Sequence, residues 1–228
     1  MNEYIAIIPA RGGSERIKNK NLTRINGKSL LQMAVEAAKN ANFFSRVIVN
    51  SEDSEIILEA GNLGIETYNR PIELASSSAS VIDVVKEMIL QLNFDPTARV
   101  FVLLPTAPLR ESIDLIEMKN VYDRQSDEKK ALVSVSEFDN PIQLAQKIID
   151  NKLNPVFERA YKKSTKSTAH EKTYRFNECA VINSAQGFLE QENLIGTKSI
   201  PYLMPNEKSI AIDNSFQKKL VELLLNEK

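Results

Sequence analysis

Two kinds of hydrophobic pattern alternate along the first 136 residues of this chain. Short apolar runs rich in β-branched residues predict four buried strands, at Tyr4–Pro9 and at residues 46–50, 99–104 and 131–136. Apolar residues at helical spacing predict helices between these strands, within residues 30–38, 56–60 and 81–92. Strands joined by such helices need right-handed crossovers, so we predict an α/β fold with a mainly parallel sheet. Ligands of such folds bind beyond the carboxyl ends of the strands.

The pattern changes after residue 136. Residues 144–157 resemble a β-hairpin with Asp150 and Asn151 at its turn, and a lysine-rich stretch follows at residues 162–172. We interpret residues 140–177 as an inserted arm, because a segment so short and polar does not form a core of its own. The chain is therefore expected to be one domain, residues 1–228, that carries this arm.

The end of the chain predicts an amphipathic closing helix at residues 214–225. Asn214 can cap its first turn. Four apolar side chains at helical spacing can share one face: Phe216, Leu220, Leu223 and Leu224.

Composition narrows the classes of function. The 228 residues carry a net charge of -1 with both signs scattered, so no global basic field attracts a nucleic acid. The single cysteine, Cys179, and single histidine, His170, exclude a disulfide framework and a Cys/His zinc site. The chain begins without the features of a signal peptide, and no apolar run approaches the roughly 20 residues of a membrane span. We expect a cytoplasmic protein with neither nucleic acid nor membrane as a partner.

A basic, glycine-containing loop follows the first predicted strand. The adjacent Gly12 and Gly13 let the backbone turn closely around phosphate oxygens, and Arg11, Arg16 and Lys20 can neutralise their charge. The spacing does not match the G-x-x-x-x-G-K-[ST] loop of kinases and GTPases, and the third glycine of G-x-G-x-x-G is missing. The loop therefore predicts phosphate binding of another kind.

Here the chain resembles a known family. The run IPARGGS at residues 8–14, followed by Lys20 and Asn21, resembles the nucleotide-binding signature of the N-acylneuraminate cytidylyltransferases. Further similarities follow in the family's order: RPIELA at residues 70–75, LPTAPLR at 104–110 like Q-P-T-S-P-L-R, YRFN at 174–177 like Y-x-x-N-G, MP at 204–205, and SIAID at 209–213 like S-x-D-I-D. The resemblance covers nearly the whole chain and fades only across the arm.

The resemblance implies a three-layer, Rossmann-like nucleotidyltransferase with a mainly parallel mixed sheet of about seven strands and an inserted arm through which a homodimer forms. It implies transfer of CMP from CTP to a nonulosonic, sialic-type sugar acid, with Mg²⁺ as cofactor and pyrophosphate as the leaving group. It assigns residues to CTP: Ala10, Arg11, Gly12, Gly13, Ser14, Arg16, Lys20, Asn21, Arg70 and Ala79. It assigns others to the sugar acid: Leu104, Thr106, Ala107, Tyr174 and Asn177.

Nucleotidyl transfer needs no enzyme nucleophile, because the anomeric hydroxyl of the sugar attacks the α-phosphorus. By the resemblance, Arg11, Lys20 and Asp213 are the catalytic candidates, and Asp213 is the carboxylate that would bind Mg²⁺. Plainer interpretations stay open: Asp213 as a helix cap, Asn21 as a turn residue, Arg70 as a surface arginine.

Five positions depart from the family's pattern. Ala211 replaces the first acid of S-x-D-I-D, Glu15 a lysine of the loop, Leu104 a glutamine before Pro105, and Glu178 the glycine that follows the asparagine of Y-x-x-N-G. Glu52 stands where the family has an aspartate at a strand end. Ala211, Glu15 and Leu104 favour an alternative, a catalytically impaired homologue that binds CTP or a CMP-sugar.

A second alternative is a cytidylyltransferase for another 3-deoxy sugar acid, Kdo. That family resembles the opening of this chain, but it has lysine-proline in place of Lys20 and Asn21, and it lacks the doubled glycine. The sialic-type branch is therefore the preferred interpretation.

Overall fold

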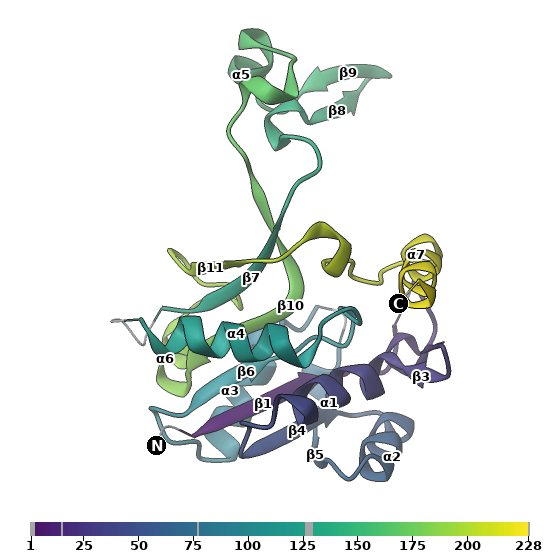
Figure 1. The fold of residues 1–228 in the computed structure, drawn as a ribbon, viewed down its shortest axis with the longest axis vertical. Helices are drawn as coiled ribbons and strands as arrows, with labels where there is room; N and C mark the ends of the chain where they lie inside the picture. The colour runs from purple at the N-terminus through teal and green to yellow at the C-terminus, as the bar shows by residue number, and fades with distance from the viewer. Residues whose placement is uncertain (1–2, 15, 77, 126–129, 228) are drawn as a thin grey trace.

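A seven-stranded mixed sheet runs through the protein (Figure 1). The computed structural model describes residues 3–14, 16–76, 78–125 and 130–227. The strand order across the sheet is β11-β7-β10-β6-β1-β4-β5. Two short hairpins lie outside the sheet: β2 (Arg24–Ile25) with β3 (Lys28–Ser29), and β8 (Gln146–Ile149) with β9 (Lys152–Pro155).

The strands predicted from continuous apolar runs form the centre of the sheet. β1 (Tyr4–Pro9) pairs in parallel with β4 (Arg46–Ser51) on one side and with β6 (Arg99–Val102) on the other. All four residues of β6 are buried, as expected for a strand covered on both faces. The structure confirms the predicted α/β fold with a mainly parallel sheet.

Three strands of the sheet were not predicted. β5 (Glu66–Asn69) and β11 (Ile200–Leu203) are edge strands, largely exposed, so they lack an apolar run. β10 (Tyr174–Ser184) is antiparallel to both β6 and β7 (Leu132–Glu137) and is interrupted by a bulge after Phe176. Because β10 contains polar residues and a bulge, it has no regular hydrophobic period that would predict a strand.

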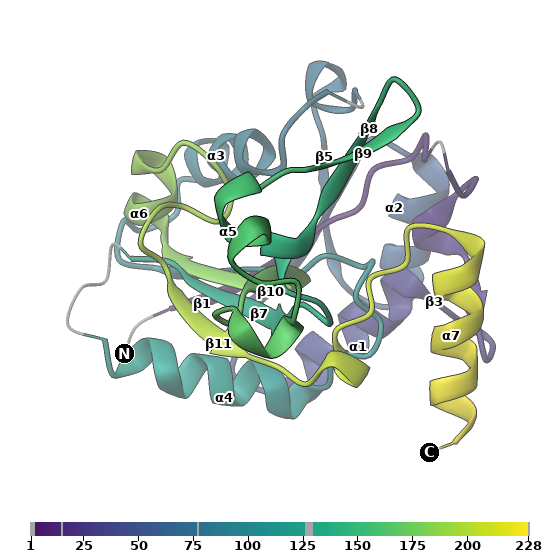
Figure 2. The same ribbon diagram turned by 90° about the horizontal axis from the view of Figure 1, so that it is seen from above.

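Helices cover both faces of the sheet and complete three layers (Figures 1 and 2). One apolar cluster joins the sheet to three helices: α1 (Leu30–Ala41), α2 (Ser54–Asn62) and α4 (Ser112–Asp123). The other cluster joins the opposite face to α3 (Val81–Gln91) and α6 (Ala185–Glu190). The first turns of α1, α2 and α3 are capped by the side chains of Ser29, Asp53 and Ser80.

The closing helix α7 (Ser215–Asn226) forms as expected, with Asn214 capping it. Its buried face differs from the predicted one. Val221 is fully buried, whereas Phe216 and Leu223 are exposed. The helix packs by one narrow stripe on a small cluster beside the β2–β3 hairpin, so only part of its apolar surface is covered.

A lobe projects from the sheet between β7 and β10 (Figure 1). We call residues 138–173 the projecting lobe; it contains β8, β9 and the short helix α5 (Glu158–Lys163). Residues 174–177, assigned to the arm in the sequence, are the first residues of β10. None of the helices described has the length and apolar character that a membrane crossing requires.

Candidate active site

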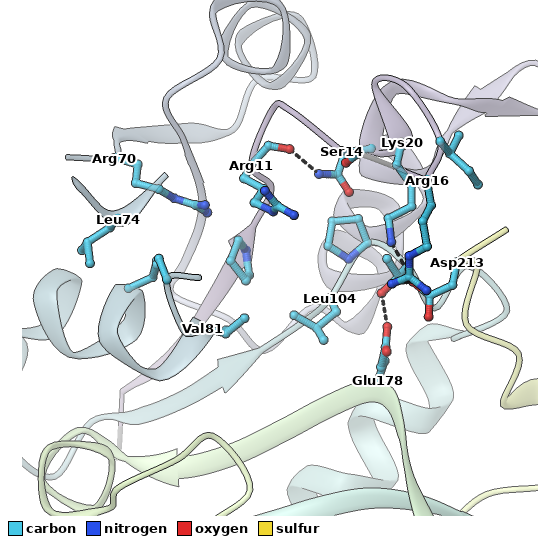
Figure 3. Close-up of a pocket in the computed structure, with 17 residues that line it drawn as sticks. Arg11, Ser14, Arg16, Lys20, Arg70, Leu74, Val81, Leu104, Glu178 and Asp213 are labelled. Carbon is cyan, nitrogen blue, oxygen red and sulfur yellow. Dashed lines mark hydrogen bonds and ion pairs between the residues drawn. The ribbon is translucent and has the colours of Figure 1, made fainter. Parts of the chain in front are cut away.

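A pocket of about 430 Å³ lies beyond the carboxyl ends of β1, β5 and β6 (Figure 3). This volume is within the range of small-molecule sites. Its walls come from the loop after β1, the start of α3, the loop after β6, the bulge of β10 and the segment before α7. The lining residues are Pro9, Arg11, Ser14, Arg16, Ile17, Lys20, Asn21, Arg70, Leu74, Ala79, Val81, Val84, Leu104, Pro105, Thr106, Glu178 and Asp213.

Cations dominate the charge of this pocket. Among the described lining residues, the four cations Arg11, Arg16, Lys20 and Arg70 outnumber the two acids, Glu178 and Asp213. A concave surface with such an excess of one sign concentrates ligands of the opposite sign. The pocket therefore favours a polyanion.

The loop after β1 is tied down at both ends by hydrogen bonds. The backbone N–H of Ala10 donates to the carbonyl of Asn50 in β4, at 2.9 Å. The side-chain Nδ2 of Asn21 donates to the carbonyl of Arg11, also at 2.9 Å. Asn21 is 6% exposed and thus holds the loop closed from within. The Arg11 side chain lines the pocket from a backbone that is held in place.

Gly12 is required where the loop passes the start of α2. Its N–H donates to Oε1 of Glu52 at 2.8 Å, so this departure from the family's aspartate anchors the loop. A Cβ at Gly12 would come within 2.6 Å of Oδ2 of Asp53, the cap of α2. Gly13 has a positive φ of 55° and is exposed. Neither glycine lines the pocket; Glu15 lies outside the described residues.

Arg70 is a buried cation at one end of the pocket, only 6% exposed. Its Nε donates to Oδ1 of Asn50, and Glu52 lies 3.8 Å from its NH1 atom. Burial lowers the pKa of Arg70; Glu52 opposes this shift and Arg11 adds to it. The plain interpretation of a solvated surface arginine is wrong, because a charge so deeply buried is held by its partners.

Asp213 is clamped by two cations at the other end of the pocket (Figure 3). Its Oδ1 atom accepts from Nζ of Lys20 at 3.0 Å and lies 3.1 Å from NH2 of Arg16. Asp213 does not cap α7, because Asn214 has that role. No group of three or more potential metal ligands occurs among the described histidine, cysteine, aspartate and glutamate residues.

Leu104, Thr106 and Glu178 form the wall between the loop after β6 and the bulge of β10. Thr106 Oγ1 donates to Oε2 of Glu178 at 2.5 Å. Glu178 has a φ of 65°, in the left-handed region that glycine adopts freely. A non-glycine residue there costs roughly 1–2 kcal/mol. This residue was noted in the sequence as a departure, but not as a member of the site.

The remaining residues assigned to the sugar acid do not line the pocket. Ala107 is buried behind the wall, and Tyr174 is exposed at the base of the projecting lobe. Asn177 is 1% exposed; it donates to Ser209 Oγ and accepts from the N–H of Cys179.

Burial raises the pKa of Cys179 to about 12, so its thiol stays protonated near neutral pH.

Several residues that line the pocket were not predicted as site residues from the sequence: Pro9, Ile17, Leu74, Val81, Val84, Pro105 and Glu178. Val81 and Val84 follow the helical period of α3, which marks them equally as core residues. The sequence signal that could have identified Glu178 is a large residue where a glycine is expected, beside a pocket.

The part of the sequence that carries this loop and the buried Arg70 matches one protein family over most of the chain. A profile described as cytidylyltransferase matches residues 5–207. The chain belongs to the cytidylyltransferase family. This family relation confirms the resemblance found in the sequence and makes the protein a nucleotidyltransferase of the CTP-using class.

Two relatives of the chain are named as cytidylyltransferases of sugar acids. The chain is 32% identical over 214 residues to an N-acylneuraminate cytidylyltransferase of Escherichia coli, covering 93% of this chain and 49% of that protein. It thus spans about half the length of that relative. It is 31% identical over 215 residues to a pseudaminic acid cytidylyltransferase of Campylobacter jejuni, covering 92% of this chain and 90% of the relative.

Solved structures share the fold at lower identity. One is CMP:2-keto-3-deoxy-manno-octonic acid synthetase complexed with CTP, with a TM-score of 0.71 at 13% identity and 99% coverage of both chains. Another is 4-diphosphocytidyl-2C-methyl-D-erythritol synthase, with a TM-score of 0.72 at 11% identity and 99% coverage of both chains. At such identities the similarity is one of fold.

Proposed function

We propose that this cytidylyltransferase transfers CMP from CTP to a nonulosonic, sialic-type sugar acid and releases pyrophosphate. The observation that supports this proposal most strongly is the cation-rich pocket beyond the carboxyl ends of β1, β5 and β6. A triphosphate and a sugar carboxylate are both anions, as such a pocket favours.

In the proposed reaction, the anomeric hydroxyl oxygen bonds to the α-phosphorus while the bond from that phosphorus to the bridging oxygen of pyrophosphate breaks. The hydroxyl proton passes to solvent water, and the electron pair of the broken bond leaves with pyrophosphate. The protein must therefore align the reactants and stabilise charge on phosphate oxygens. Arg11, Arg16 and Lys20 have the charge and position for this role, with Ser14 as a hydroxyl donor.

We infer that the base of CTP binds at the end of the pocket where Arg70 and Leu74 lie (Figure 3). Leu74, Val81 and Val84 provide an apolar wall there for a flat ring. Asn21 and Ala79 line the same pocket, and Arg70 is rigidly held by Asn50. We therefore assign the recognition of cytosine to Asn21, Arg70 and Ala79.

Mg²⁺ fits this site through Asp213. Mg²⁺ in phosphate-binding sites takes one or two carboxylates together with phosphate oxygens, and Asp213 is a pocket-lining carboxylate. When bound, the ion would neutralise developing charge on the phosphates. Lys20 and Arg16 orient the carboxylate by contacting its Oδ1 atom.

The test is pyrophosphate release from CTP and Mg²⁺ with a panel of N-acetylneuraminate, pseudaminate, N,N'-diacetyllegionaminate and Kdo. We expect turnover with one of the first three acids, and none when ATP, GTP or UTP replaces CTP. Turnover with Kdo alone would support the Kdo alternative. The solved CMP:2-keto-3-deoxy-manno-octonic acid synthetase, which is 13% identical to this chain, has the same fold.

A second candidate function is binding of CTP or a CMP-sugar without turnover. One observation favours it: position 211 presents a methyl group where a second acid is expected, and Asp213 is already bound by two cations. Calorimetry with CTP separates the two candidates. Tight CTP binding with no pyrophosphate from any acid, and turnover gained in Ala211→Asp, would establish the second.

We also propose that the protein is a homodimer formed through the projecting lobe. Ile148 and Leu153 in its hairpin are 75% and 66% exposed, which is unusual for large apolar residues that lie together. Sedimentation at micromolar concentration is expected to give twice the monomer mass, and Ile148→Asp combined with Leu153→Asp the monomer mass. A wild-type monomer would refute the proposal.

A further inference from the structure

Glu178 is a strained residue beside the pocket. It has a φ of 65° within the bulge of β10, between Phe176 and Val181. Non-glycine residues persist in this region of conformational space where the surrounding structure forces them, and they are concentrated at functional sites.

The bulge is held by bonds on every side. Asn177 receives the N–H of Cys179 on its own side chain, and Arg110 NH1 donates to the carbonyls of Cys179 and Leu104. The N–H of Ala180 donates to Ser134 Oγ at 2.9 Å. The backbone at position 178 is thus set by its neighbours, and the glutamate side chain does not determine it.

The side chain of Glu178 lies on the pocket wall that carries Asp213. Thr106 connects the two: its hydroxyl donates to Glu178, and its carbonyl accepts from the N–H of Ile212, which precedes Asp213. Figure 3 shows Glu178 pointing toward the end of the pocket where Lys20, Arg16 and Asp213 meet. This is the end away from Arg70.

The two acids of this wall differ in their partners. Asp213 is neutralised by Lys20 and Arg16. In the described part of the chain, Glu178 has a hydroxyl as its partner and no cation within ion-pair distance. A carboxylate with two oxygens can accept about four hydrogen bonds, so most of its capacity is available to a ligand.

We propose that Glu178 accepts a hydrogen bond from a hydroxyl or N–H group of the sugar acid and, with Leu104, determines which sugar acid binds. This inference rests on the proposed transfer to a sugar acid. A carboxylate repels the substrate's own carboxylate, so the group that it faces is a donor. Leu104 lines the same wall and provides an apolar contact, such as the methyl of an acyl or deoxy group.

The experiment compares the wild type with Glu178→Gln and Glu178→Gly, using CTP, Mg²⁺ and the panel of N-acetylneuraminate, pseudaminate and N,N'-diacetyllegionaminate. A charged acceptor is about twice as strong as a neutral one. We expect Glu178→Gln to raise the KM of the accepted sugar acid about 10-fold, and Glu178→Gly to raise it more and to reduce discrimination among the acids. The KM of CTP should stay within about 2-fold.

Glu192→Gln is the matched control, because Glu192 is exposed and does not line the pocket. It should change neither KM. Calorimetric titration of each acid into the CTP-analogue complex provides a readout without turnover, and a thermal melt of each variant verifies its folding.

The outcomes separate the two proposals. If no acid of the panel binds or reacts with the wild type, the proposed function fails and this inference with it. If the wild type is active and Glu178→Gln keeps the same KM and the same ranking of acids, this inference alone is wrong. A changed requirement for Mg²⁺ with unchanged sugar KM would also overturn it, because the carboxylate would then serve the metal.

Discussion

Replacing Glu178 with glycine should stabilise the protein relative to replacing it with alanine. Both variants lose the carboxylate and its hydrogen bond from Thr106, so the comparison isolates the Cβ atom. At a φ of 65°, that Cβ is close to the following carbonyl oxygen, whereas glycine has no such conflict.

The magnitude follows from two opposing contributions. The left-handed conformation costs an L-residue roughly 1–2 kcal/mol. The glycine variant loses about 0.5–1 kcal/mol of this advantage, because glycine gives the unfolded chain more conformational freedom. The net advantage of Glu178→Gly over Glu178→Ala is therefore about 0.5–1 kcal/mol. For a domain of this size, about 1 kcal/mol shifts Tm by roughly 2–4 °C.

The assay is urea unfolding together with a thermal melt of the two variants, with two further pairs as controls. Lys198 also has a positive φ, 59°, and is exposed, so its glycine variant should again be the more stable. Glu192 is exposed and its φ is not positive, so there alanine should equal or exceed glycine. If alanine and glycine were equal at 178 while both control pairs behaved as expected, the strain argument would be refuted.

Three further predictions follow from the site and the sheet. Gly12→Ala should lower kcat/KM for CTP roughly 10- to 100-fold, because its Cβ would come within 2.6 Å of Asp53. The control Gly61→Ala should leave kcat/KM unchanged, because its Cβ meets nothing within 4 Å. Equal kinetics of the two variants would contradict the geometry. Asp213→Asn should lower kcat about 10²–10³-fold. Calorimetry should give unchanged or tighter CTP binding, because the substitution frees the two cations that Asp213 holds. Turnover at the wild-type rate would exclude a catalytic role for Asp213. Asp123→Asn should destabilise the fold by about 1–3 kcal/mol at pH 7. Asp123 pairs with Arg99 and Lys119 and accepts a hydrogen bond from the hydroxyl of Tyr4. Burial raises the pKa of Asp123, but these three partners lower it on balance, so its contribution to stability is present above about pH 4 and is lost as pH falls through the folded-state pKa. The unfolding curves of both proteins should converge in acid, and a gap that persists at pH 2 would refute this.

The centre of the fold could be predicted from the sequence because burial on both faces leaves a continuous apolar run. β1, β4 and β6 have such runs, and the helices between them show the helical period. The edge strands β5 and β11 have one exposed side and mixed residues, so nothing in their local sequence distinguishes them from loops.

The candidate site was partly predictable for a related reason. A loop with two glycines and three cations directly after a strand indicates phosphate chemistry by residue type alone. Which of its groups reach the pocket is a tertiary matter: Arg11, Arg16 and Lys20 line it, whereas the N–H of Gly12 is bound by Glu52, 40 residues later.

The α/β class, the parallel centre of the sheet, the phosphate loop and the resemblance to cytidylyltransferases could all be inferred from the sequence, because they depend on local periodicity and on short ordered motifs. The environment of each side chain, in contrast, depends on how distant segments pack together in the folded protein. The tertiary structure brings Lys20 to Asp213 across 193 positions and Thr106 to Glu178 across 72. Such pairings depend on strand order and on a bulge, which no local pattern encodes, and they decide which charges in the pocket are neutralised and which are available to a substrate.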